Sequence, residues 1–305
     1  MGDMNKFKLT CLAAGLSVAS ISANAFLITD WTYLNDAGFD QWTSSTDSID
    51  PSGIDATGAT LDVFDVEDLF GGELPKTLTW GAPYGSGNPR SALEIGEAQS
   101  DSVTTSVVDG VGTLDFATGT GLTHENWGVT GDTLVAATLF DGLFLTPTAP
   151  VVGPELIAPV LQFAVIFEET YNTPTGGVCK YGDTLVGEEG INVAGCSDLF
   201  TLVLGPDVTY QVVDGDIYLT NSFTIPFDGY NEYEYTLTTR LQGLTVLDDI
   251  DCGDAATCIG FLTEEQKTNE LQAGFAISAA RVPEPGTLAI FGLGLLGLAS
   301  IRRRA

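Results

Sequence analysis

Polar and apolar residues alternate through the middle of the chain, and this alternation predicts β-strands. Residues 232–238, EYEYTLT, alternate with period two, as a half-buried antiparallel strand does. Residues 160–167, VLQFAVIF, form a longer apolar run that predicts a strand buried on both faces. Similar patterns predict strands at 133–140, 199–204, 208–213, 216–220 and 273–278.

Turn signals separate these segments. Both residues of an Asp-Gly pair tolerate a positive φ, so such pairs suit tight hairpin turns. The pairs are Asp109-Gly110, Asp141-Gly142, Asp214-Gly215 and Asp228-Gly229. One short helix is predicted, because residues 263–266, TEEQ, have a capping-box pattern that could start a helix through Leu271.

Prolines interrupt the pattern between residues 147 and 159. Four of them fall within 13 residues, at Pro147, Pro150, Pro154 and Pro159. Because proline donates no hydrogen bond to a strand ladder, this stretch predicts a long crossing loop. Many short strands joined by Gly and Asp turns predict an all-β fold, an antiparallel β-sandwich of jelly-roll type, for residues 26–281.

The N-terminus has the layout of an export signal. Lys6 and Lys8 precede an apolar run that ends at Ile21, and Ala23-Asn24-Ala25 has the form after which signal peptidase cuts. Residues 1–25 are therefore predicted to be a secretory signal peptide, with a buried N-terminal helix as the alternative. Signal peptidase is the partner that this implies, and Phe26 would begin the mature protein.

The net charge excludes some partners. Residues 26–283 keep 39 of the 41 acidic and six of the 11 basic side chains, a formal net charge of −33. Such a charge argues against binding nucleic acid or an anionic membrane surface. It favours solubility and offers many oxygen ligands to hard cations.

Cysteine usage agrees with export. Cys11 lies in the predicted signal peptide, and an even number of cysteines remains, which in a secreted chain predicts two disulfides. The local pairing, Cys179 with Cys196 and Cys252 with Cys258, is the simplest of three. No C-x-x-C spacing supports a zinc site, and we expect no cofactor other than calcium.

Two acidic segments are the candidates for calcium binding. Residues 47–73 hold eight carboxylates, and a denser group follows near Cys252. The second group is Asp248, Asp249, Asp251 and Asp254. Neither has the spacing of an EF-hand loop, so each could equally be a solvated acidic loop.

The C-terminal tail has three parts. Val282-Pro283-Glu284-Pro285 is stiff and extended, residues 286–301 are uncharged and predict a short transmembrane helix, and Arg302, Arg303 and Arg304 follow. By the positive-inside tendency the arginines stay cytoplasmic.

The order of these parts across residues 282–305 resembles the PEP-CTERM sorting signal of Gram-negative bacteria. The resemblance implies export across the inner membrane, transient single-pass anchoring, and processing by an exosortase near the Pro-Glu-Pro element. It also implies release to the cell surface or extracellular matrix. A permanent single-span anchor is the alternative.

A second motif lies in the body. Residues 121–127, GLTHENW, contain Thr123, His124 and Asn126 in the order T-H-x-N, and this resembles the THxN family of PEP-CTERM proteins. His124 is the only histidine. We expect these side chains to hydrogen-bond a turn between strands while Trp127 packs in the core. A ligand or catalytic role is the alternative, but no nucleophile elbow accompanies the histidine.

These observations predict a non-enzymatic surface or matrix protein associated with exopolysaccharide or biofilm. Aromatic side chains could include a platform on which sugars stack. The candidates are the tryptophans Trp31, Trp42, Trp80 and Trp127, together with nine tyrosines. A secreted polysaccharide hydrolase is the alternative, since such an enzyme needs only two well-placed carboxylates.

Overall fold

The computed structural model describes residues 26–282 except 47–52, 62–71, 108–113, 159–160, 175, 183–184, 188–189, 206–207, 224, 226–232, 248–251 and 253–256. Several sequence predictions fall outside the described residues. They are the signal peptide 1–25, the tail beyond Val282, the turns Asp109-Gly110 and Asp228-Gly229, and the calcium candidates Asp248, Asp249, Asp251 and Asp254.

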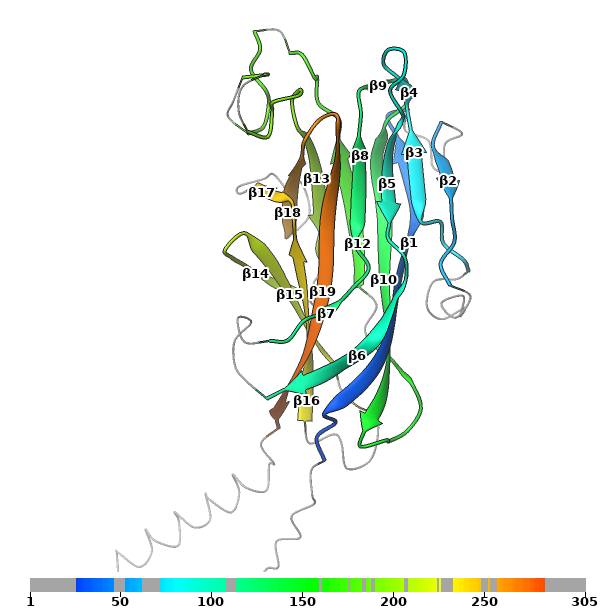
Figure 1. The fold of residues 1–305 in the computed structure, drawn as a ribbon, viewed down its shortest axis with the longest axis vertical. Coiled ribbons are helices and arrows are strands. Elements are labelled where there is room, and N and C mark those ends of the chain that lie inside the picture. The colour runs from blue at the N-terminus through cyan, green and yellow to red at the C-terminus, as the bar shows by residue number, and fades with distance from the viewer. Residues whose placement is uncertain are drawn as a thin grey trace, which may run out of the picture.

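The described residues form strands in two facing layers, drawn in Figure 1. The first layer contains, in spatial order, β6 (Gln99–Ser106), β1 (Asp30–Ser44), β10 (Leu134–Ala149), β12 (Leu161–Glu168), β13 (Asp198–Val203), β18 (Cys258–Thr263) and β17 (Thr245–Leu247). A short β11 (Leu156–Ile157) pairs with β10.

The second layer is built around β19 (Lys267–Arg281). It contains, in spatial order, β14 (Thr209–Val213), β15 (Asp216–Phe223), β16 (Tyr233–Gln242), β19, β8 (Leu122–Asn126), β5 (Ser91–Ile95), β3 (Thr77–Trp80) and β2 (Asp55–Thr57). The short β7 (Ala117–Thr118) also pairs with β19, and β6 joins the layers by pairing with both β1 and β19. A separate ribbon pairs β4 (Ala82–Pro83) with β9 (Val129–Thr130).

Apolar side chains from both layers fill the space between them. The larger cluster packs Phe163 and Phe200 of the first layer against Leu93 and Trp80 of the second. A smaller cluster around Trp31 fills the other end. The prediction of an all-β protein is confirmed, and the two packed layers agree with a β-sandwich.

The predicted helix from Thr263 to Leu271 is wrong. β18 ends at Thr263, and β19 begins at Lys267. Gln266 adopts φ 57°, which belongs to a turn, and the Asn269 side chain accepts a hydrogen bond from Glu264 N at 2.7 Å. The polar TEEQ sequence therefore forms a hairpin turn. The described residues contain no helix, so none of them forms a helical membrane span.

The strand predictions need three other corrections. β12 is not buried on both faces, because its side chains alternate between buried and exposed. Asp141-Gly142 is not a turn, because β10 continues through it while pairing with β1. Pro147 also lies within β10, opposite Trp31, next to a register shift where the missing donor is tolerated.

Other predictions of turns and connections are confirmed. Asp214-Gly215 forms the turn between β14 and β15, with φ 54° and 88°. Pro150 and Pro154 lie in the connection from β10 to β11, as expected of the proline-rich stretch. The disulfides Cys179–Cys196 and Cys252–Cys258 are both present.

A polar contact lies where the two apolar clusters meet. Asn35 Nδ2 donates to Asp141 Oδ1 at 2.7 Å, and Asn35 Oδ1 accepts from Thr120 N at 2.6 Å. Asp141 lines an internal space between the layers. Burial raises the pKa of Asp141 to about 7; the Asn35 hydrogen bond acts in the opposite direction, and the nearby Asp36 carboxylate adds to the rise.

We expect Asp141 to make stability depend on pH. Its folded pKa lies above the usual value near 4, so the folded state holds a proton that the unfolded state has lost between about pH 4 and pH 7. Its contribution to the free energy of unfolding therefore falls as pH rises, by at most about 1.4 kcal/mol per pH unit. The free energy of unfolding of Asp141→Asn, measured with urea, should therefore increase relative to that of the wild type as pH rises across this window. A stability difference that stays constant with pH would contradict a protonated Asp141 carboxyl in the folded state.

Candidate functional site

The THxN residues lie in a strand, and the side chains of His124 and Asn126 hydrogen-bond to Thr263, where β18 ends and the turn to β19 begins. Thr123, His124 and Asn126 belong to β8, which pairs with β5 on one side and β19 on the other. His124 and Asn126 point into the protein and are buried, at 3% and 0% exposure. Because neighbouring strand residues point to opposite faces, Glu125 lies on the outer face, where it accepts from Thr268 Oγ1.

His124 is held by aromatic rings and one hydroxyl. Its ring stacks on Trp80 with centroids 5.7 Å apart and meets Phe167 edge-on at 5.0 Å. Its Nδ1 lies 3.0 Å from Thr263 Oγ1, which itself donates to the Asp198 carbonyl at 3.4 Å. The hydroxyl therefore accepts from Nδ1–H, and Nε2 is the unprotonated nitrogen. Burial lowers the pKa of His124 to about 3, so the imidazole is neutral.

None of the four tryptophans of the predicted sugar-stacking platform is exposed. Trp31 and Trp80 have no exposed surface, and Trp42 is half-buried against the larger core cluster. Trp127 was expected in the core but is half-buried outside both clusters, and its Nε1 donates to Glu125 Oε2 at 3.2 Å. Among the described residues, the exposed aromatic side chains are Phe26 and the tyrosines Tyr84, Tyr171 and Tyr210, and the tyrosines belong to the group from which the platform was predicted.

An acidic cluster adjoins the His124 strand. Asp198 starts β13, Glu265 lies in the β18–β19 turn, and Glu169 directly follows β12. Asp198 and Glu265 have no exposed surface. Nothing in the local sequence marked these residues, because they are separated by up to 96 positions along the chain and only the strand pairing brings them together.

The three carboxyl groups influence one another. Burial, followed by repulsion from Glu265, raises the pKa of Glu169 to about 8. Burial and the charges of Glu169 and Glu265 raise the pKa of Asp198 well above its usual range, while Thr170 N and the Asn126 side chain act in the opposite direction. Burial raises the pKa of Glu265 to about 7, against an opposing hydrogen bond from Asn172.

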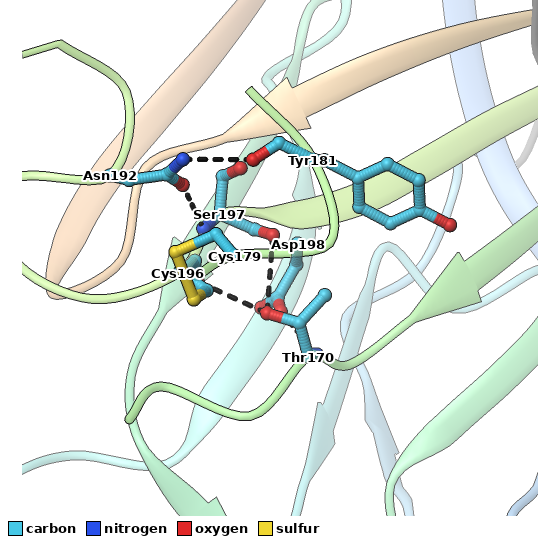
Figure 2. The surroundings of a disulfide bond; sticks show 7 residues. All are labelled: Thr170, Cys179, Tyr181, Asn192, Cys196, Ser197 and Asp198. Atoms are coloured by element: carbon cyan, nitrogen blue, oxygen red, sulfur yellow. Dashed lines mark hydrogen bonds between the residues drawn. A yellow bond between two sulfur atoms is a disulfide. The ribbon is translucent and has the colours of Figure 1, made fainter. Parts of the chain in front are cut away.

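The Cys179–Cys196 disulfide holds the connection between β12 and β13 near Asp198, as Figure 2 shows. Thr170 N donates to Asp198 Oδ1 at 2.7 Å, and Thr170 Oγ1 donates to the Cys196 carbonyl at 3.2 Å. The connection is therefore tied to the start of β13 by covalent and hydrogen bonds.

Asn192 adds a second tie in the same connection (Figure 2). Its Oδ1 accepts from Ser197 N at 2.8 Å, and its Nδ2 donates to the Tyr181 carbonyl at 2.8 Å. Within the described part of the chain, no group of three or more His, Cys, Asp or Glu side chains has the geometry of a ready metal centre.

The acidic cluster and the point where the described chain stops lie at opposite ends of the body. In Figure 1, β19 ends at the lower end, where the described chain stops at Val282, whereas the β18–β19 turn and the end of β8 lie at the upper end. The end of β8 that follows His124 and the acidic cluster are therefore remote from Val282.

Comparison with known proteins identifies the class of the tail. Residues 281–304 match the family described as PEP-CTERM protein-sorting motif, the C-terminal sorting signal of exosortase substrates. The resemblance seen at residues 282–305 is thus confirmed. The signal implies an exported protein that exosortase processes and that resides at the cell surface or outside the cell. No curated protein matches the chain.

We expect His124→Ala to destabilise the fold. The change removes the stacked ring and leaves a cavity against Trp80 and Phe167, which costs roughly 3 kcal/mol of unfolding free energy. Glu125→Ala, on the outer face of the same strand, should cost about 1 kcal/mol or less. Urea unfolding of both variants checks the contrast. Equal stability of His124→Ala and wild type would favour a ligand role for the imidazole.

Proposed function

We propose that the mature protein is a non-enzymatic adhesive or structural component of the cell surface or the exopolysaccharide matrix of a biofilm. Its body would contact polysaccharide at the end remote from the sorting signal. The THxN residues would then serve as part of the packed scaffold, consistent with the neutral, enclosed His124.

Two exposed tyrosines carry this proposal. Tyr171 is 87% exposed and Tyr84 is 69% exposed. Both belong to the upper end, because Gly128 lies near both Tyr84 and Asn172, the residue that follows Tyr171. A tyrosine ring offers an apolar face and a hydroxyl group, so it can stack on a sugar ring and hydrogen-bond to it. The formal charge of −33 on residues 26–283 favours neutral over anionic polysaccharide.

The alternative of a polysaccharide hydrolase has less support. A glycosidase needs two carboxyl groups that flank a bound sugar chain. Asp198 and Glu265, whose pKa values are raised as those of catalytic acids can be, have no exposed surface that a polymer could reach. This burial argues against Asp198 and Glu265 as the catalytic pair of such an enzyme.

A glycan array and a hydrolysis screen with the exported, mature protein test the function. We expect binding to neutral glycans without released sugars. Tyr84→Ala combined with Tyr171→Ala should weaken binding about tenfold or more, since each stacking contact contributes about 1 kcal/mol. Tyr210→Ala is the matched control, because that exposed tyrosine lies on β14. Sugar release, or unchanged binding by the double variant, would refute the proposal.

Processing at both ends has its own test. If the tail is a transient anchor, the mature form should begin at Phe26 and end near Pro283–Pro285, because exosortase would remove the arginine-rich terminus. Mass spectrometry of the protein recovered from its native location measures both ends. Retention of Arg302–Arg304 on the mature form would establish a permanent anchor instead.

A further inference from the structure

Exposed apolar side chains lie at the lower end of the body, around the point where the described chain stops. They are Phe26, Val107, Val151 and Val282, exposed at 52%, 60%, 81% and 42%. We call these four residues the apolar end. Single exposed apolar residues are normal on a protein surface, but several in one place mark a surface that contacts an apolar partner.

The ends of two strands place Val107 next to Val282. Val282 directly follows β19, and Val107 directly follows β6. The last residue of β6 pairs with Ser278, three residues before the end of β19. Figure 1 shows both strands ending at the lower end of the body. These two valines therefore belong to one surface.

The start of β1 adds the other two residues. Thr29 N donates to the carbonyl of Ala149, the last residue of β10, at 2.8 Å. Val151 lies two residues beyond Ala149, and Phe26 lies three residues before Thr29. The Thr29 carbonyl accepts from Thr105 N of β6 at 2.8 Å, which ties this pair of segments to the strand that precedes Val107.

Buried neighbours hold the exposed side chains in place. Leu27 and Val152 pack against the smaller core cluster, and each is adjacent in sequence to a member of the apolar end. The side chains of Phe26 and Val151 are therefore left at the surface of fixed segments. This surface is built into the fold and faces the side from which the tail leaves.

The length of chain between the apolar end and the tail identifies the partner. Only residues 283–285 separate Val282 from the uncharged segment 286–301. A chain extends at most about 3.6 Å per residue, so Val282 lies within about 14 Å of Gly286. If the tail spans a bilayer as its sequence predicts, Gly286 enters the hydrocarbon layer. The apolar end must then lie in or against the lipid headgroups.

The predicted span is also short. Its 16 residues would extend about 24 Å as a helix, whereas the hydrocarbon core of a bilayer is about 30 Å thick. A short span is accommodated by thinning of the bilayer and by flanking groups that reach into the interface. Both adjustments bring the lower end of the body closer to lipid, and exposed apolar side chains make that contact favourable.

We propose that the apolar end docks on the bilayer surface while the tail is attached, so that the upper end of the body points away from the membrane. This inference rests on the transient anchoring that the sorting signal implies. Docking would hold residues 283–285, the Pro-Glu-Pro element, at the bilayer surface during processing.

The tail makes docking possible because the surface is small. Four partly buried side chains remove little apolar area from water, so the body alone binds lipid weakly. Attachment through the tail makes the contact intramolecular and raises its effective concentration. Removal of the tail would therefore release the body. The carboxylates of Asp30, at the start of β1, and Glu234, which pairs opposite Ala280, favour a neutral over an anionic lipid surface.

Labelled protein in phosphatidylcholine vesicles tests the surface. The exported chain with its tail retained carries an environment-sensitive fluorophore on Val151→Cys. This cysteine is the free thiol, because the other four form two disulfides. Its emission should shift to shorter wavelength on reconstitution, because lipid replaces water around it. A quencher attached to the lipid headgroups should quench it about twofold or more relative to the same label on Val178→Cys.

Val178 is the matched control position. It is 62% exposed and lies in the connection between β12 and β13, at the upper end of the body. A second pair of variants carries the label on Val107→Cys. Val151→Asp should return the emission of this label to its value in water, whereas Val178→Asp should not. Neither substitution disturbs the core, since both side chains are exposed.

Co-flotation with the vesicles measures insertion of the tail separately. Inserted protein whose labels at Val107 and Val151 keep the emission they have in water would overturn the docking surface and leave the anchoring prediction standing. Equal quenching at Val151 and Val178 would also overturn it, because contact would then not be confined to the apolar end. Protein that does not float with the vesicles would refute the anchoring prediction, and docking with it.

Discussion

The pairing of β19 along both of its edges is the constraint on which the rest of the structure depends. One edge pairs with β16 over ten residues, and the other pairs in turn with β8, β7 and β6. Register matters because side chains alternate along a strand. A shift of one residue between β8 and β19 would turn His124 outward and Glu125 into the core. The β19 ladder therefore decides which half of the THxN motif is buried.

Burial of acidic groups is the main energetic conflict in this fold. A strongly anionic surface is easily solvated, but Asp198 and Glu265 are removed from water altogether. Hydrogen bonds offset part of the free energy of removing these carboxyl groups from water. One example is the hydrogen bond that Thr170 N donates to Asp198 Oδ1. The remaining cost explains why the pKa values of the clustered carboxyl groups are raised.

The two ends of the body carry different features. The sorting motif begins where β19 ends, and the acidic cluster lies beyond the opposite end of the same strand. A body attached through its tail would present the cluster and the exposed tyrosines away from the attachment point. The disulfide Cys179–Cys196 fixes the connection that forms much of this remote end.

The sequence by itself determined the all-β class, most strand positions and the sorting motif, because each depends on short-range patterns or composition. It favoured the local cysteine pairing, and the structure decided between the three possible pairings. Predictions from local sequence were wrong where pairing with a distant strand decided the conformation. Asp141-Gly142 stays extended because it pairs with β1. The residues TEEQ form a turn because they connect β18 to β19. The candidate site could not be read from the sequence. Its residues, Asn126, Glu169, Asp198 and Glu265, come from four separate segments of the chain. Only the tertiary structure brings them together. The reason is that strand register, rather than spacing along the sequence, sets which side chains lie in the same buried region.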